Sequence, residues 1–172
     1  ASAEYGTGNT LRAKASYYGR VSDNFGISVG GFYTRTDGFF DNAYDGSDCD
    51  RGHSAGGRVR MVWQGADGWS IDNVASVGSS LEGGYAYCLY DEASGTVSPV
   101  NYNGPNSYER VNVTDGFVVK HAGEKMLFTS ATGYQYLYDR MLIDNDFTPR
   151  SLFTLVQQQR EHALTEDIVL RS

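Results

Sequence analysis

The chain has 172 residues, a length that suits one domain, and carries 21 glycines and 13 tyrosines but only 3 prolines. Its net charge of −7, with 40% hydrophobic residues, excludes a disordered acidic tail and a nucleic-acid-binding protein, because phosphate contacts need clustered Lys and Arg. No run of about 18 apolar residues is present, so a transmembrane helix is excluded, whereas a transmembrane strand needs only about 9–11 alternating residues.

Apolar and polar residues alternate with a period of two through most of the chain, as in β-strands with one apolar and one polar face. In the first such segment Leu11 and Ala13 alternate with Arg12 and Lys14. An exception is Asp115, which falls on the apolar face of its strand. The predicted strands cover residues 11–18, 25–34, 58–64, 69–77 and 110–120, followed by two of weaker contrast at 126–138 and 158–172.

Short turns and long connections alternate between these seven predicted strands. Gly, Asp or Asn supplies the geometry of each tight turn. Tight turns at one end of a sheet and long loops at the other are typical of outer-membrane barrels, whose strand counts are even in single bacterial chains. We therefore expect an all-β, antiparallel up-and-down meander, with about seven strands belonging to a larger transmembrane β-barrel. The tight turns are expected at 21–24, 65–68 and 122–125, and the long connections at about 38–54, 81–108 and 139–157.

One helix signal interrupts the strand pattern in the third long connection. Thr148 can cap a helix and Pro149 suits its first position. Leu152, Phe153 and Val156 follow at helical spacing, which predicts a short turn of helix.

Several segments also resemble barrel segments of TonB-dependent outer-membrane receptors, and their order and spacing carry the resemblance. The likeness covers most of the chain and falls in the first part of the family's barrel. The segments are 83–87 (GGYAY), 127–136 (LFTSATGYQY), 144–149 (DNDFTP) and 162–172 (HALTEDIVLRS).

The resemblance implies that residues 1–172 are a partial barrel domain, about a third of the wall of a barrel of about 22 strands around a plug. The plug domain and the remaining strands are absent from this chain. The implied function is TonB-energised uptake of a scarce nutrient across the outer membrane of a Gram-negative bacterium, most often a ferric siderophore or similar chelate, or else cobalamin or a glycan. The implied partners are outer-membrane lipid, the TonB complex acting through the plug, and the small nutrient ligand, with no nucleic acid.

Basic residues gather on the predicted polar faces. They could pass an anionic ligand, or they could belong to the charged, hydrated wall that any plugged barrel needs. The apolar positions Leu11, Ile27, Val59, Met61, Ile71 and Val113 are expected on the opposite side, toward lipid. The expected lumen-facing residues are Arg12, Lys14, Arg58, Arg60 and Arg110.

Tyrosines crowd the second long connection. Tyr85, Tyr87, Tyr90 and Tyr102 could stack on a sugar or an aromatic chelator, or they could form the interfacial aromatic girdle of a barrel. These four residues are the candidate ligand-binding positions.

The two cysteines, Cys49 and Cys88, lie in long connections that the topology places on the same, outer side of the membrane. That side is oxidising, so a disulfide bond between them is a candidate. The alternative is two unpaired thiols, each buried as a small hydrophobe within its own loop.

Nothing in the sequence predicts a metal, a cofactor or catalysis. An EF-hand starting at Asp41 fails, because Ala43 takes its third ligand position and Gly52 its twelfth. The three histidines are isolated, and no G-x-S-x-G elbow is present. Two alternatives to a receptor segment remain open: a soluble β-sandwich that binds glycans, and a small complete outer-membrane barrel with a structural or adhesive role.

Overall fold

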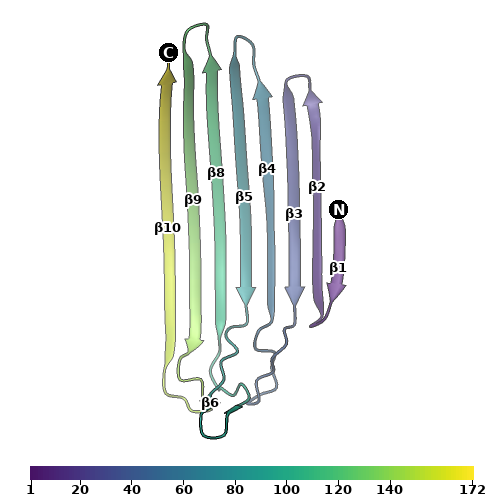
Figure 1. The fold of residues 1–172 in the computed structure, drawn as a ribbon, viewed down its shortest axis with the longest axis vertical. Helices are drawn as coiled ribbons and strands as arrows, with labels where there is room; N and C mark the ends of the chain where they lie inside the picture. The colour runs from purple at the N-terminus through teal and green to yellow at the C-terminus, as the bar shows by residue number, and fades with distance from the viewer.

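The computed structural model describes all residues 1–172 and consists of strands without any helix. Eight strands form one antiparallel sheet in the order β1-β2-β3-β4-β5-β8-β9-β10 (Figure 1). The order of the strands in the sheet is therefore their order along the chain. This confirms the predicted all-β, antiparallel meander. The sheet is open, with β1 and β10 at its two edges. The strands are β1 (Ser2–Gly6), β2 (Thr10–Ser22), β3 (Phe25–Thr36), β4 (Gly52–Gln64), β5 (Trp69–Glu82), β8 (Ser107–Ala122), β9 (Leu127–Asp144) and β10 (Thr154–Arg171).

The connections differ in length at the two ends of the sheet (Figure 1). Tight turns close the β2–β3, β4–β5 and β8–β9 hairpins at one end. At the other end lie residues 37–51, 83–106 and 145–153, and the second of these contains a small hairpin of β6 (Tyr90–Asp91) and β7 (Thr96–Val97). The predicted alternation of turns and loops is therefore present from β2 onward, whereas residues 7–9 join β1 to β2 by a short turn at the long-loop end. None of the chain forms a helix that could cross a membrane.

The predicted helix near Thr148 is wrong. Asp146 builds a turn instead: its carboxylate accepts hydrogen bonds from the backbone N–H of Thr148, at 3.0 Å, and of Leu152, at 3.3 Å. Val156 already belongs to β10, where it pairs with Leu142 of β9. The third long connection shortens from 139–157 to 145–153, because β9 continues to Asp144 and β10 begins at Thr154.

The register of the sheet divides the side chains between two faces. Directly paired residues share a face, so the pairs Ile27–Met61 and Trp63–Ile71 join the apolar positions of three strands, β3, β4 and β5. The same reasoning places all six expected apolar positions on one side, which we call the apolar face. The side opposite, the polar face, carries Arg12, Lys14, Arg58, Arg60 and Arg110.

Asp115 and Glu166 place carboxylates within the apolar face, and both are hydrogen-bonded there. Asp115, which the alternation already placed there, accepts a bond of 2.9 Å from the amide of Asn73. Glu166 accepts bonds from the hydroxyl groups of Ser130, at 2.7 Å, and Thr132. Each carboxylate therefore accepts its hydrogen bonds from a neighbouring strand of the same sheet.

Neither face of the sheet is covered by another layer. Only 8 of the 172 residues are buried, and all eight lie in the long loops or at the strand ends beside them. Apolar side chains in mid-sheet stay exposed, for example Val77 at 54% and Ile168 at 66%. The buried residues are Asn42, Cys49, Val100, Tyr102, Asn106, Asp139, Ile143 and Asp144.

The three long loops are joined to one another by hydrogen bonds to backbone groups. The side chain of Asn42 bridges to the second loop, donating to the carbonyl of Tyr102 at 2.8 Å and accepting from its N–H at 3.2 Å. The N–H of Asn103 donates to the carbonyl of Thr148 in the third loop, at 3.2 Å. We call this interlocked unit the loop cap.

The β4–β5 turn requires glycine at position 68. Gly68 has φ +79°, and an added Cβ would lie 2.2 Å from the carbonyl oxygen of Ala122 in the neighbouring hairpin. We expect Gly68→Ala to lower the free energy of unfolding by roughly 2 kcal/mol or more, since left-handed backbone and a clash combine. Chemical denaturation followed by circular dichroism measures this.

Gly46 provides the control. Its φ is +73°, but nothing lies within 4 Å of an added Cβ. Gly46→Ala should therefore show the backbone strain alone, about 1 kcal/mol. Equal effects of the two substitutions would contradict the close approach of the β4–β5 turn to Ala122.

Candidate functional site

The five basic residues that the sequence predicts on the polar face fall into two groups. Arg60 donates from Nε to Asp72 at 2.9 Å, and Arg110 lies 2.6 Å from Asp139. Arg12, Lys14 and Arg58 form no ion pair. The polar face therefore combines neutralised arginines with uncompensated cations.

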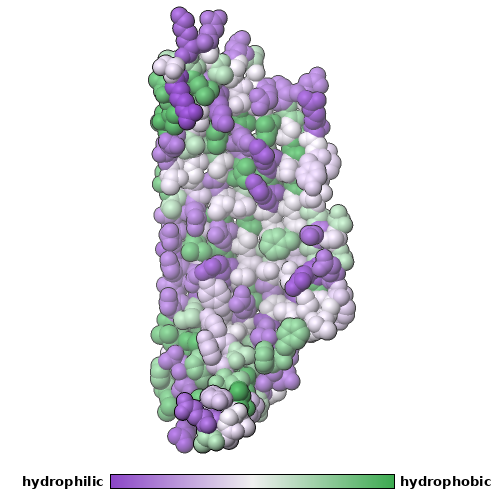
Figure 2. All heavy atoms as spheres, viewed as in Figure 1, coloured by the Kyte–Doolittle hydropathy of each residue, from purple (hydrophilic) through white to green (hydrophobic).

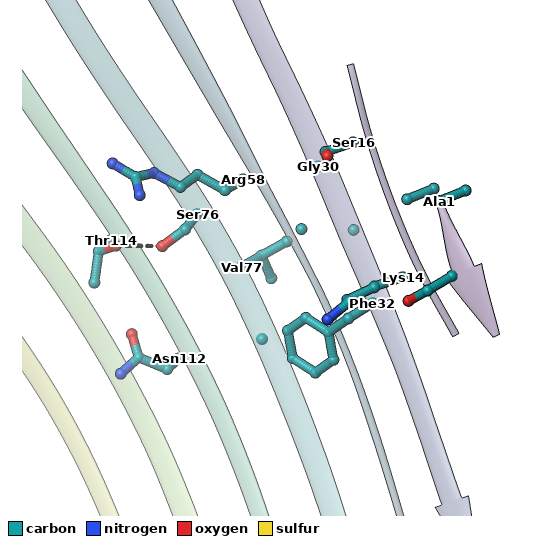
Figure 3. Close-up of a pocket in the computed structure, with 15 residues that line it drawn as sticks. Ala1, Lys14, Ser16, Gly30, Phe32, Arg58, Ser76, Val77, Asn112 and Thr114 are labelled. Atoms are coloured by element: carbon teal, nitrogen blue, oxygen red, sulfur yellow. Dashed lines mark hydrogen bonds between the residues drawn. The ribbon is translucent and has the colours of Figure 1, made fainter. Parts of the chain in front are cut away.

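Two of the uncompensated cations border a hollow on this face (Figure 3). The hollow has a volume of about 680 Å³ and lies over β1 to β5 and β8. Lys14 reaches it from β2 and Arg58 from β4, while β5 and β8 contribute Ser76 and Thr114, whose hydroxyl groups are 2.6 Å apart. The spread over six strands explains why no local motif marks it.

Glycine residues, which have no side chain, leave room for the hollow. Gly30 and Gly78 take polar-face positions on β3 and β5, so backbone forms part of its floor. Phe32 fills the space above Gly56: a Cβ at residue 56 would lie 2.6 Å from the Phe32 ring and 2.9 Å from the carbonyl oxygen of Val77. The ring of Phe32 is 49% exposed and faces the hollow.

These groups offer binding chemistry. Ammonium and guanidinium groups attract an anion, hydroxyl groups and the carboxamide of Asn112 add hydrogen bonds, and Phe32 provides an apolar ring. Figure 2 shows that hydrophilic residues extend along the strands on the side of the sheet turned to the viewer, with apolar residues among them.

The four candidate tyrosines do not form one site. Tyr85 and Tyr87 stack with ring centroids 5.9 Å apart, and Tyr87 meets Phe147 at 4.6 Å. Tyr90 lies on β6 and is 64% exposed, whereas Tyr102 is buried in the loop cap beside Cys49 and Val100. Sequence reasoning missed Phe147, which comes from the third loop and has φ +50°, because nothing in the sequence ties it to the second loop.

Burial sets the protonation of the loop core. It raises the pKa of Tyr102 to about 12 and also raises the pKa of the Cys49 thiol. In the exposed first loop the hydrogen bond from Ser47 instead lowers the pKa of Asp45, whose carboxylate closes a local turn. Asp50 likewise accepts from the backbone N–H groups of Phe39 and Phe40. The structure gathers no group of three or more His, Cys, Asp and Glu residues that could hold a metal.

The cysteines do not form the candidate disulfide bond in this structure. Both are free thiols, Cys49 buried and Cys88 exposed. Cys49 packs as a small apolar residue against Val100 and Tyr102, which matches the alternative for this residue, whereas Cys88 lies on the surface of its loop.

Comparisons with known proteins do not identify a function for this chain. No protein-family model matches the chain, and no curated protein sequence matches it either. The resemblance to TonB-dependent receptors therefore rests on the four segments quoted above.

The two thiols should differ in reactivity. A maleimide reagent near neutral pH is expected to label Cys88 rapidly and Cys49 only after unfolding, because Cys49 is buried and burial raises its pKa, which leaves little thiolate. Mass spectrometry after alkylation, with and without denaturant, counts the labelled thiols. A chain that takes up no label until it is reduced would instead contain the disulfide bond.

Alkaline pH should weaken the loop cap through Tyr102. Because its pKa in the folded chain, about 12, lies above the ordinary tyrosine value of about 10, the folded state holds the phenol proton more tightly. The resulting stability is complete below about pH 10 and is lost as the pH rises toward 12, by roughly 1–2 kcal/mol.

Tyr102→Phe isolates this effect from the other tyrosines. Absorbance at the tyrosinate band should show one titration fewer near pH 12 in the variant. The stability of the variant should also fall less steeply than that of the unaltered chain between pH 10 and 12. Identical pH profiles would contradict a buried phenol at residue 102.

Proposed function

We propose that this chain forms part of the wall of a β-barrel in the outer membrane of a Gram-negative bacterium, as a segment of a receptor for TonB-energised nutrient uptake. One observation carries the proposal: a single-layered sheet whose two faces differ in polarity and of which neither is buried. An apolar face of this extent is unfavourable in water and needs an apolar cover. A bilayer provides one without a second protein layer.

The apolar face has the height that a membrane requires. On β4, Trp63 stands near the tight turn, and Ala55 shares its row with Tyr33. Residues 55–63 are nine residues, within the span of about 9–11 that a tilted strand needs. Aromatic residues thus mark both limits of the band, with Trp63 and Trp69 toward the turns and Tyr33 and Tyr138 toward the loops, as in the girdles of outer-membrane barrels.

The polar face suits a water-filled interior. An Arg at the bilayer midplane facing lipid is unfavourable by about 2–4 kcal/mol, so cations such as Lys14 and Arg58 in the middle of the polar face favour the opposite face as the lipid side. In this arrangement the tight turns would be periplasmic and the loop cap extracellular, because outer-membrane barrels keep their long loops outside.

The two alternatives fit less well. A β-sandwich needs a second sheet packed on the first, and the eight-stranded sheet has none. A complete eight-stranded barrel needs its two edge strands to pair with each other, whereas β1 and β10 are the separate edges of an open sheet. A section of a larger wall accommodates both edges.

The transported nutrient follows from the resemblance and from the charge of the polar face. We propose a ferric siderophore or similar anionic chelate, ahead of cobalamin or a glycan. Energy would come from the TonB complex through a plug domain.

The two tryptophans of the chain test the membrane orientation without a label, since Trp63 and Trp69 both lie on the apolar face. In liposomes, brominated lipid chains should quench most of the tryptophan fluorescence, whereas aqueous acrylamide should quench little. Strong quenching by acrylamide alone would overturn the assignment of this face to lipid.

A matched variant moves the fluorophore to the other face. Val62 neighbours Trp63 on β4 but belongs to the polar face. The variant Trp63→Phe/Trp69→Phe/Val62→Trp should therefore be quenched by acrylamide and not by brominated lipid. Similar quenching of both proteins would show that the faces do not separate lipid from water.

A further inference from the structure

The hollow on the polar face has an unbalanced charge. The chain as a whole is acidic, with net charge −7, and neighbouring cations such as Arg60 are neutralised by carboxylates. Lys14 and Arg58 border the hollow without any such partner. Two cations that form no ion pair beside one hollow give an acidic protein a local complement to an anion.

An aromatic ring lies between the two cations. Lys14 on β2 is paired directly with Phe32 on β3, and Phe32 in turn is paired with Gly56, two residues from Arg58 on β4. The cations are two strand spacings apart, about 10 Å laterally. In Figure 3 the ring of Phe32 lies beside the amine of Lys14, and the guanidinium of Arg58 extends away from that ring at the other side of the hollow.

The far side of the hollow supplies neutral hydrogen-bonding groups. Ser76 and Thr114 share one hydrogen bond and keep further capacity, and Asn112 contributes a carboxamide. The volume, about 680 Å³, lies within the range of about 300–1,000 Å³ typical of sites for small molecules.

We propose that this hollow binds a small organic anion with a flat ring and carboxylate groups, held by Lys14 and Arg58 and stacked on Phe32. The inference rests on the proposed function to the extent that the polar face must line a water-filled interior that solutes reach. It deepens that function by locating on the wall a contact point for an anionic solute.

Titration calorimetry of the full chain in a non-ionic detergent tests the proposal, with terephthalate as the probe because its carboxylates stand at opposite ends of a ring. Terephthalate should bind, and neutral benzamide should not. Lys14→Gln and Arg58→Gln should each weaken binding about tenfold, since each removes a charge-assisted contact.

Arg20→Gln is the matched control. Arg20 lies on the same strand and face as Lys14, contacts the carbonyl of Asp23 near the tight turn, and does not line the hollow. Its loss changes the net charge equally and should leave terephthalate binding within twofold. Equal weakening in all three variants, or no binding to the unaltered chain, would overturn the proposal.

Phosphate and Phe32→Leu test the role of the ring. Inorganic phosphate should bind more weakly than terephthalate, and Phe32→Leu should lower the affinity for terephthalate but not for phosphate. Equal affinity for both anions would overturn the stacking contact. Failure of anion binding while the tryptophans remain quenched by brominated lipid rejects the hollow alone, whereas tryptophans in contact with water reject the membrane assignment itself.

Discussion

The structure depends on hydrogen bonds between neighbouring strands, since the sheet has no core of its own. Of 108 backbone hydrogen bonds, 92 lie within the strands. They hold the sheet laterally but leave both faces to their surroundings. The distribution of side chains between the two faces therefore decides in which surroundings the sheet is stable. The alternation of polar and apolar residues thus determines the environment of the sheet as well as its fold.

The loop cap is the exception, because it buries residues as a globular protein does. Asn42 joins the first two loops, and Cys49, Val100 and Tyr102 form a small apolar centre beneath. The sheet positions these loops together, because all three follow strands that end at the same side of the sheet. The tight turns at the opposite end have no comparable cluster.

Face and topology could be predicted from the sequence because both depend on local patterns. A period of two assigns each residue to a face, and tight turns join consecutive strands. β1 escaped prediction because five residues are too few for alternation to stand out, and the strands at 126–138 and 158–172 showed weak contrast because Glu166 and Thr132 occupy apolar-face positions. The helical spacing that includes Val156 gave a wrong prediction, because Val156 belongs to β10 and pairs with β9. The hollow was beyond prediction, because only the register brings Lys14, Phe32 and Gly56 into one row.

The free edge of β10 sets a condition on assembly. About half of the backbone N–H and C=O groups of its 18 residues point away from β9 and have no partner. An unpaired backbone group in hydrocarbon is unfavourable by several kcal/mol, so β10 could not remain an unpaired edge strand inside a bilayer. If the sheet belongs to a membrane wall as proposed, the strand that completes it must arrive before or during insertion. Entry into the membrane would then be a cooperative event of the whole wall, because no intermediate with an unpaired β10 would be stable there.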